Sequence, residues 1–157
     1  MTRRPAVASL LYSLLLAAMA SGQIADRDGF AEAIEGSRLL EGTAAAGASY
    51  ALPSLELAVA ILLLASRAGP RALGRAGGVL GLALAVFWST LAAQAFVRGL
   101  SVGNCACFGV YLAQELRWWV LLEDAYMLAL AWYAAANAGL SLPRPRLARP
   151  ARRVVLS

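Results

Sequence analysis

The stretch SYALPSLELAVAILLLAS, residues 49–66, contains a single charged side chain, Glu56. A helix needs about 20 predominantly apolar residues to cross the hydrocarbon of a bilayer. Three further apolar stretches of similar length lie at about residues 6–25, 76–97 and 118–140. Hydrophobic residues make up 61% of the 157-residue chain, against about 45–50% in a soluble domain. These features predict an all-α, polytopic membrane protein built as a bundle of four transmembrane helices.

The segments between and after these spans are too short for a soluble domain. In residues 26–47, Phe30, Ile34 and Leu39 or Leu40 recur at helical spacing among acids, which indicates a short amphipathic helix on the membrane surface. The tail, residues 141–157, is rich in proline and arginine, and we expect it to be disordered. The third span carries small residues at every fourth position, which favour close helix packing. They are Gly77, Gly81, Ala85, Ser89 and Ala93.

Arginine is the only basic residue type in the chain, and it is divided unevenly between the two ends of the spans. One side collects Arg3, Arg4, Arg67, Arg71, Arg75 and the arginines of the tail, and the other has Arg27, Arg38, Arg98 and Arg117. Because short arginine-rich segments stay in the cytoplasm, both termini are predicted to face it, in a bacterial inner membrane. The net charge of +5 then reflects topology, and we predict no nucleic-acid partner. A cleaved signal peptide is an alternative for the first span, and it leaves the other helices in the same orientation.

Both cysteines lie in GNCACFG, residues 103–109, between the third and fourth spans and therefore on the outer side. Thiols in an oxidising compartment form disulfides or exchange them. A bridge across one residue needs a tight turn and is strained, which suits exchange better than a permanent cross-link. We therefore predict a redox pair, Cys105 and Cys107. One alternative is that the two thiolates bind a soft metal ion together with a partner protein. The chain has no histidine, so no metal site of its own is predicted. The other alternative is that the cysteines have no chemical role.

Few ionisable side chains interrupt the spans, and such residues are functional candidates because burying them is costly. Glu56 lies about six residues from the outer end of the second span, Glu123 and Asp124 lie at a similar depth in the fourth, and Arg98 ends the third. In one interpretation these groups form a structural ion-paired cluster, with Arg98 bound to an acid. In the other, Arg98 favours a thiolate in the cysteine pair, and Glu56 or Asp124 carries protons during exchange.

The runs SYALPSLELAVAILLL and RGLSVGNCACFG, followed by a closing apolar helix, resemble the methylamine-utilisation family MauE, within the wider DoxX-like redox-associated membrane proteins. The resemblance extends from the first helix to about Ala138. Its most specific parts are Cys-x-Cys-Phe-Gly, here residues 105–109, and Leu-Pro-x-x-Glu, here residues 52–56. Glycine is usual between the cysteines of the family, whereas this chain has Ala106. Alanine resists positive φ, so the substitution narrows the turns through which the pair can close.

The resemblance implies a four-helix inner-membrane protein that acts with a periplasmic thioredoxin-like partner in assembling methylamine dehydrogenase, whose small subunit is a disulfide-rich periplasmic substrate. Two function classes stay open. The first is a membrane thiol–disulfide electron carrier, with a quinone as the candidate electron acceptor and no bound cofactor. The second is a non-catalytic scaffold or assembly factor with incidental cysteines. In both, the lipid bilayer surrounds the helices.

Overall fold

The computed structural model describes residues 3–100 and 117–140, and the elements in these ranges are helices. This confirms the predicted all-α class. The helices are α1 (Arg3–Ala25), α2 (Arg27–Gly36), α3 (Thr43–Ala65), α4 (Arg71–Val97) and α5 (Trp118–Asn137).

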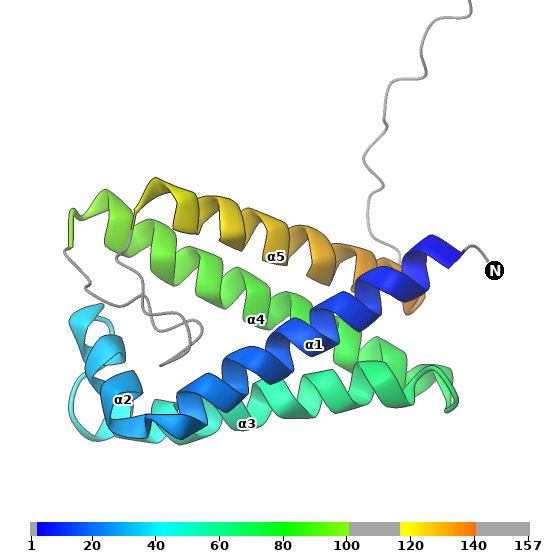
Figure 1. The fold of residues 1–157 in the computed structure, drawn as a ribbon, viewed down its shortest axis with the longest axis horizontal. Helices are drawn as coiled ribbons and strands as arrows, with labels where there is room; N and C mark the ends of the chain where they lie inside the picture. Colours follow the sequence, from blue (N-terminus) through cyan, green and yellow to red (C-terminus); the bar gives the residue numbers. More distant parts are fainter. Residues whose placement is uncertain (1–2, 101–116, 141–157) are drawn as a thin grey trace, which may run out of the picture.

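The four long helices pack as a bundle, and the short helix α2 lies at one end of it (Figure 1). Helix α1 packs against α3 and α5, and α4 packs against the same two helices. Helices α3 and α5 therefore occupy opposite corners of the bundle. We call the end that carries α2 the α2 end, and the opposite end, where α3 connects to α4, the arginine end.

Three described helices are long and apolar enough to cross a membrane, over Val7–Ala25, Thr43–Ala65 and Arg71–Val97. Helix α5 is 20 residues long, but Glu123 and Asp124 lower its mean hydropathy. Three spans are therefore supported. The fourth span and the orientation with both termini inside stay predictions.

Helices α3 and α4 begin five or more residues before the apolar stretches that predicted them. Helix α3 begins at Thr43, because the run TAAAGA ahead of residue 49 is rich in alanine, the best helix former. Helix α4 begins at Arg71, directly after Pro70, whose extended backbone makes it the N-cap. Hydropathy marks the residues suited to hydrocarbon, whereas helix propensity and proline decide where the helix begins.

Helix α2 is amphipathic, as predicted, but it ends at Gly36, before Leu39 and Leu40, and its apolar face packs onto the bundle and not onto the membrane surface. Asp26 caps its N-terminus by accepting a hydrogen bond from the backbone N–H of Gly29 at 3.0 Å. Phe30 and Ile34 are buried in the hydrophobic core, and the Phe30 ring centroid lies 6.2 Å from that of Trp88 on α4. The helix thus covers the end of the bundle near Trp88.

The small residues of α4 allow close helix packing, as predicted for Gly77 and Gly81. A Cβ atom at Gly77 would lie 3.0 Å from Cβ of Leu62 on α3, and one at Gly81 would lie 2.8 Å from Cε1 of Tyr12 on α1. Gly78, outside the predicted row, approaches α5, where a Cβ would lie 2.9 Å from Cα of Ala135. The same helix therefore packs closely against three others.

We expect Gly81→Ala to destabilise the bundle, because Tyr12 is fully buried and donates a hydrogen bond to the Gly81 carbonyl at 2.6 Å. The added methyl group would displace this ring, at a cost of roughly 1–3 kcal/mol. Gly47→Ala is the matched control, since nothing lies within 4 Å of a Cβ at this exposed position of α3. Thermal unfolding in detergent measures both variants, and an equal midpoint for Gly81→Ala and the parent would contradict the packing argument.

Candidate functional site

A buried carboxyl group on α3 joins three helices near the middle of the bundle. The side chain of Glu56 is fully buried. Its Oε1 accepts a hydrogen bond from Nε1 of Trp88 on α4 at 2.8 Å and another from Nε2 of Gln23 on α1 at 3.4 Å. Trp88 and Gln23 are themselves buried. We call Glu56, Trp88 and Gln23 the carboxyl cluster.

The position of Glu56 along its helix follows from the early start of α3. Glu56 is the fourteenth of 23 residues, so it lies roughly 20 Å from the first residue of the helix at 1.5 Å per residue. This places it near the middle of α3, farther along the helix than the predicted span implied. Pro53 is buried on the same face about one turn earlier. The Leu-Pro-x-x-Glu pattern therefore directs both residues into the bundle.

Apolar and aromatic side chains surround the carboxyl cluster. Phe30 of α2 packs on Trp88, and Tyr12 of α1 hydrogen-bonds to α4 at Gly81. Within the described residues, Oε2 of Glu56 is buried and has no hydrogen-bond partner. Leaving a buried polar atom unsatisfied costs roughly 1–3 kcal/mol, which offsets part of the stability that the two hydrogen bonds at Oε1 contribute. Buried ionisable residues with an unpartnered oxygen are candidates for a functional role.

The other predicted acid, Asp124, lies on α5, at the corner of the bundle opposite α3. It is 7% exposed, and its Oδ2 has no hydrogen-bond partner among residues 3–100 and 117–140. Arg98 is the C-cap of α4 and is exposed. No hydrogen bond or ion pair between described residues joins Glu56 to either of them. The structure therefore does not bring these three groups together, and an Arg98–Glu56 ion pair is absent from it.

The predicted redox pair, Cys105 and Cys107, lies outside the described residues, as do Phe108 and Gly109. The segment that contains it connects the last residue of α4, Val97, with the first residue of α5, Trp118. Both of these helix termini are at the α2 end of the bundle (Figure 1).

Gln23 and Trp88 were not among the site residues predicted from the sequence. A signal for Trp88 was present, because tryptophan in a membrane protein is enriched at the interfaces, whereas this one lies in the middle of an apolar span. A buried indole N–H requires an acceptor, and Glu56 was the one charged candidate in the neighbouring span. Among the described residues, no group of three His, Cys, Asp or Glu side chains could hold a metal ion.

Comparison with protein families matches residues 1–137 to the family model described as methylamine utilisation protein MauE. The chain belongs to the MauE family. The match covers all five helices, the carboxyl cluster and the segment that contains both cysteines. Family membership supports a membrane protein associated with methylamine utilisation. Comparisons with curated proteins and with solved structures give no significant match.

Proposed function

We propose that this MauE-family protein is a thiol–disulfide exchange component of the bacterial inner membrane, in which Cys105 and Cys107 react with a periplasmic thioredoxin-like partner during assembly of methylamine dehydrogenase. The observation that carries the proposal is the presence of both cysteines inside the family-matched residues 1–137. No other cysteine is present in the chain. Any thiol–disulfide chemistry of this chain would therefore be carried out by Cys105 and Cys107.

The exchange reaction balances between the pair and its partner. A partner thiolate attacks one sulfur of the Cys105–Cys107 disulfide, and the other sulfur leaves as a thiolate. The second partner thiol then resolves the mixed disulfide, so the partner is oxidised and the pair is reduced. Returning the pair to a disulfide releases two electrons and two protons, and a quinone in the bilayer is the proposed acceptor. The reverse sequence transfers electrons to the partner.

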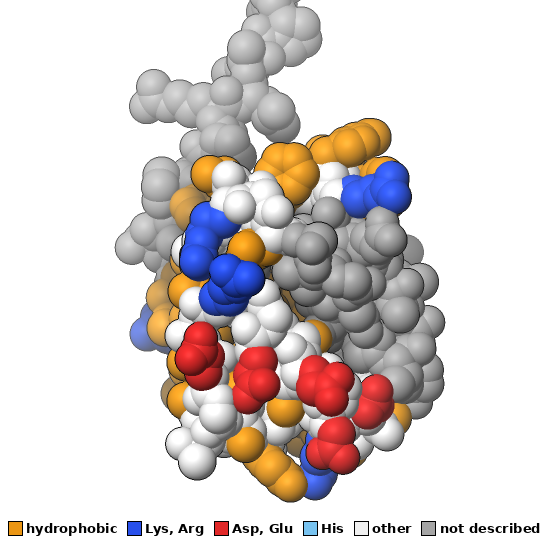
Figure 2. Space-filling view, turned by 90° about the vertical axis from the view of Figure 1, so that its left-hand side faces the viewer, with side chains coloured by type: hydrophobic (Ala, Val, Ile, Leu, Met, Phe, Trp, Pro, Cys, Tyr) orange, Lys and Arg blue, Asp and Glu red, His pale blue; other side chains and the backbone are white. Residues whose placement is uncertain are grey.

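The proposed topology has four spans, with α5 as the fourth and both termini in the cytoplasm. The distribution of charge supports it. Exposed acids gather at the α2 end, over α2 and its flanks, as Figure 2 shows. They are Asp28, Glu32, Glu35 and Glu41. At the other end, Arg67 lies in the α3–α4 connection, and Arg71 and Arg75 lie in the first two turns of α4. Such a concentration of arginine is expected on the cytoplasmic side.

The carboxyl cluster supports redox chemistry over a purely structural role. Exchange consumes and releases protons at thiols, and a buried carboxyl group with one unpartnered oxygen can accept and release a proton. Glu56 has this arrangement, on a helix that begins at the α2 end. We propose that Glu56 is a proton carrier for the pair, with Asp124 and Arg98 in supporting positions nearer that end. In this proposal Trp88 and Gln23 position the Glu56 carboxyl group, and Glu56 transfers the proton. This role can be tested separately from that of the cysteines.

The second candidate function is a non-catalytic scaffold that holds a partner near its substrate. The observation that favours it is the patch of exposed acids over α2 and its flanks at the α2 end (Figure 2), which is able to attract a basic partner. In this case the oxidation state of the cysteines has no effect on function.

Alkylation of the cysteines in whole spheroplasts tests the proposed function. We expect a membrane-impermeant maleimide to label Cys105 or Cys107 from the outside after mild reduction, because the pair faces outward and is oxidised in part. The labelled fraction before reduction should change in cells that lack the thioredoxin-like partner. Labelling that requires permeabilised membranes would contradict the orientation. An oxidation state that never responds to the partner would favour the scaffold.

A further inference from the structure

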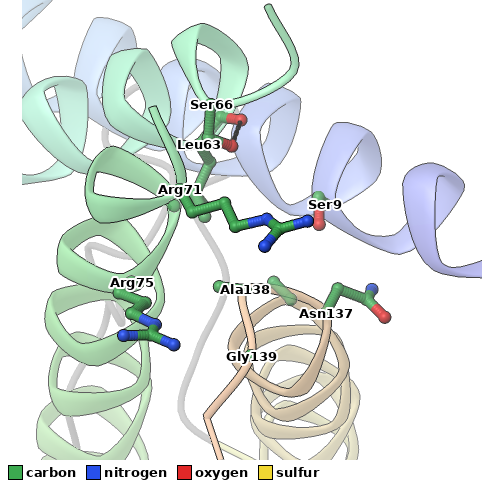
Figure 3. Close-up of a pocket in the computed structure, with 10 residues that line it drawn as sticks. Ser9, Leu63, Ser66, Arg71, Arg75, Asn137, Ala138 and Gly139 are labelled. Carbon is green, nitrogen blue, oxygen red and sulfur yellow. Dashed lines mark hydrogen bonds between the residues drawn. The ribbon is translucent and has the colours of Figure 1, made fainter. Parts of the chain in front are cut away.

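A cavity of about 370 Å³ lies at the arginine end of the bundle, between the ends of the four long helices. Its polar lining comes from α1, from the residue after α3, from α4 and from the end of α5 (Figure 3). These residues are Ser9, Ser66, Arg71, Arg75, Asn137 and Gly139. The volume is within the range of about 300–1,000 Å³ that small-ligand sites occupy. The cavity is at the opposite end from the α2 end and plays no part in the exchange reaction proposed above.

The charge of this cavity is positive and is not balanced by the chain. Arg71 and Arg75 line it, and neither forms an ion pair with an acid among the described residues. The sequence has no acidic residue within residues 1–25, 57–114 or 125–157, and every residue that lines the cavity falls in these ranges. Two neighbouring guanidinium groups without a counter-charge favour an anionic ligand.

The backbone adds to this preference at the first turn of α4. The N-cap of α4 is Pro70, which makes no side-chain hydrogen bond to the first turn. The first backbone N–H groups of the helix are therefore not capped by a side chain, and the positive end of the helix dipole lies beside the cavity. Arg71 is the first residue of α4 and also lines the cavity. Its guanidinium group and the first turn of α4 would therefore both attract an anion bound there.

The two guanidinium groups approach the cavity from different sides. Figure 3 shows Arg71 reaching across toward Ser9, with Arg75 on the side of Gly139. A Cβ atom at Gly139 would lie 3.8 Å from both Nε and Nη2 of Arg75. Gly139 has φ +85°, which favours glycine, and the Arg75 guanidinium lies directly beside it at the end of α5. An anion between the two arginines would receive donors from both.

The cavity also lies at the level where lipid phosphates are found. Arg71 is the first residue of the span Arg71–Val97, and Ser66 follows the last residue of the span Thr43–Ala65. The ends of membrane-spanning helices are in the headgroup region, where basic pockets between helices bind anionic lipids. We propose that this cavity binds the phosphate group of an anionic phospholipid headgroup, with Arg71 and Arg75 as its ligands.

The test compares lipid binding by purified full-length protein in phosphatidylcholine nanodiscs, with phosphatidylglycerol added in a titration. We expect saturable phosphatidylglycerol binding that Arg71→Gln together with Arg75→Gln weakens by roughly 10- to 30-fold, since each arginine contributes about 1 kcal/mol to attraction of an anionic lipid. Arg67→Gln is the matched control. It removes the same charge at the same end, but Arg67 does not line the cavity, and we expect less than a threefold effect.

A second arm distinguishes the two sources of phosphate. Inorganic phosphate that displaces phosphatidylglycerol from the parent protein would support a site for any phosphate group, and failure to displace it would restrict the site to the lipid. Equal weakening by Arg67→Gln and by the double variant would overturn the proposal, because the attraction would then be diffuse. Retained binding in the double variant would overturn it as well. If the double variant does not fold, Arg71→Gln alone is used, and unchanged binding by it would have the same meaning.

Discussion

Replacing both cysteines, Cys105→Ser together with Cys107→Ser, should abolish the ability of this protein to restore growth on methylamine to a strain that lacks it. A serine hydroxyl is neither a nucleophile toward disulfides nor able to form one, so every step of the proposed exchange is lost. Serine is close in size to cysteine, and both positions lie in the part of the sequence between Val97 and Trp118. The amount of protein in the membrane should therefore match the parent. Growth yield and protein abundance are measured on the same cultures.

The single variants separate exchange from other uses of the cysteines. With Cys105→Ser or Cys107→Ser, the remaining thiol can still attack a partner disulfide but cannot resolve the product. One of the two variants should therefore accumulate a mixed disulfide that reduction releases, visible as a higher band on a non-reducing gel. The double variant is the control, because it should give no such band. Full growth of the double variant would contradict the redox function and leave the scaffold as the better explanation.

Much of the fold was accessible from the sequence because the bilayer imposes simple requirements. The spacing of apolar stretches predicted an all-α protein, and small residues at every fourth position predicted close packing at Gly77 and Gly81. Helix boundaries were less accessible, since the alanine-rich run before residue 49 extends α3 without being part of the apolar stretch. The position of α2 in the fold could not be predicted, because it depends on tertiary packing. Its apolar face was predicted, whereas its contact with Trp88 requires knowledge of the neighbouring helix.

The candidate site was accessible only in part for the same reason. Glu56 was identified because a single acid in an apolar span is conspicuous. Its partners are 33 residues before it and 32 residues after it, on different helices, and no local pattern links such positions. Arg98 was the nearest opposite charge in the predicted topology, but the structure leaves it exposed at the end of α4 and gives Glu56 the neutral donors of Trp88 and Gln23. Charge complementarity was thus a poor guide in a site built from hydrogen bonds.

These partners make Glu56→Gln a sharper experiment than the sequence suggested. The glutamine side chain has the size of glutamate and keeps a carbonyl oxygen, so it can still accept the hydrogen bonds from Trp88 Nε1 and Gln23 Nε2. It cannot take up or release a proton. If Glu56 carries protons for the cysteine pair, the variant should fold and accumulate normally, yet oxidise or reduce its partner roughly 10²-fold more slowly per molecule.

Glu56→Leu is the control for structure, because it removes the acceptor and leaves the buried Trp88 N–H without its partner at 2.8 Å. That loss should cost roughly 1–3 kcal/mol of stability, lowering the thermal midpoint in detergent and the amount of protein in membranes. The contrast between the two substitutions assigns the role of the carboxyl group. A slow but stable Glu56→Gln chain beside an unstable Glu56→Leu chain identifies proton transfer at a hydrogen-bonded site. An unchanged rate per molecule in Glu56→Gln would show that the oxygen held by Trp88 is all that the protein requires of Glu56, and that the protons of the exchange reaction travel by another route.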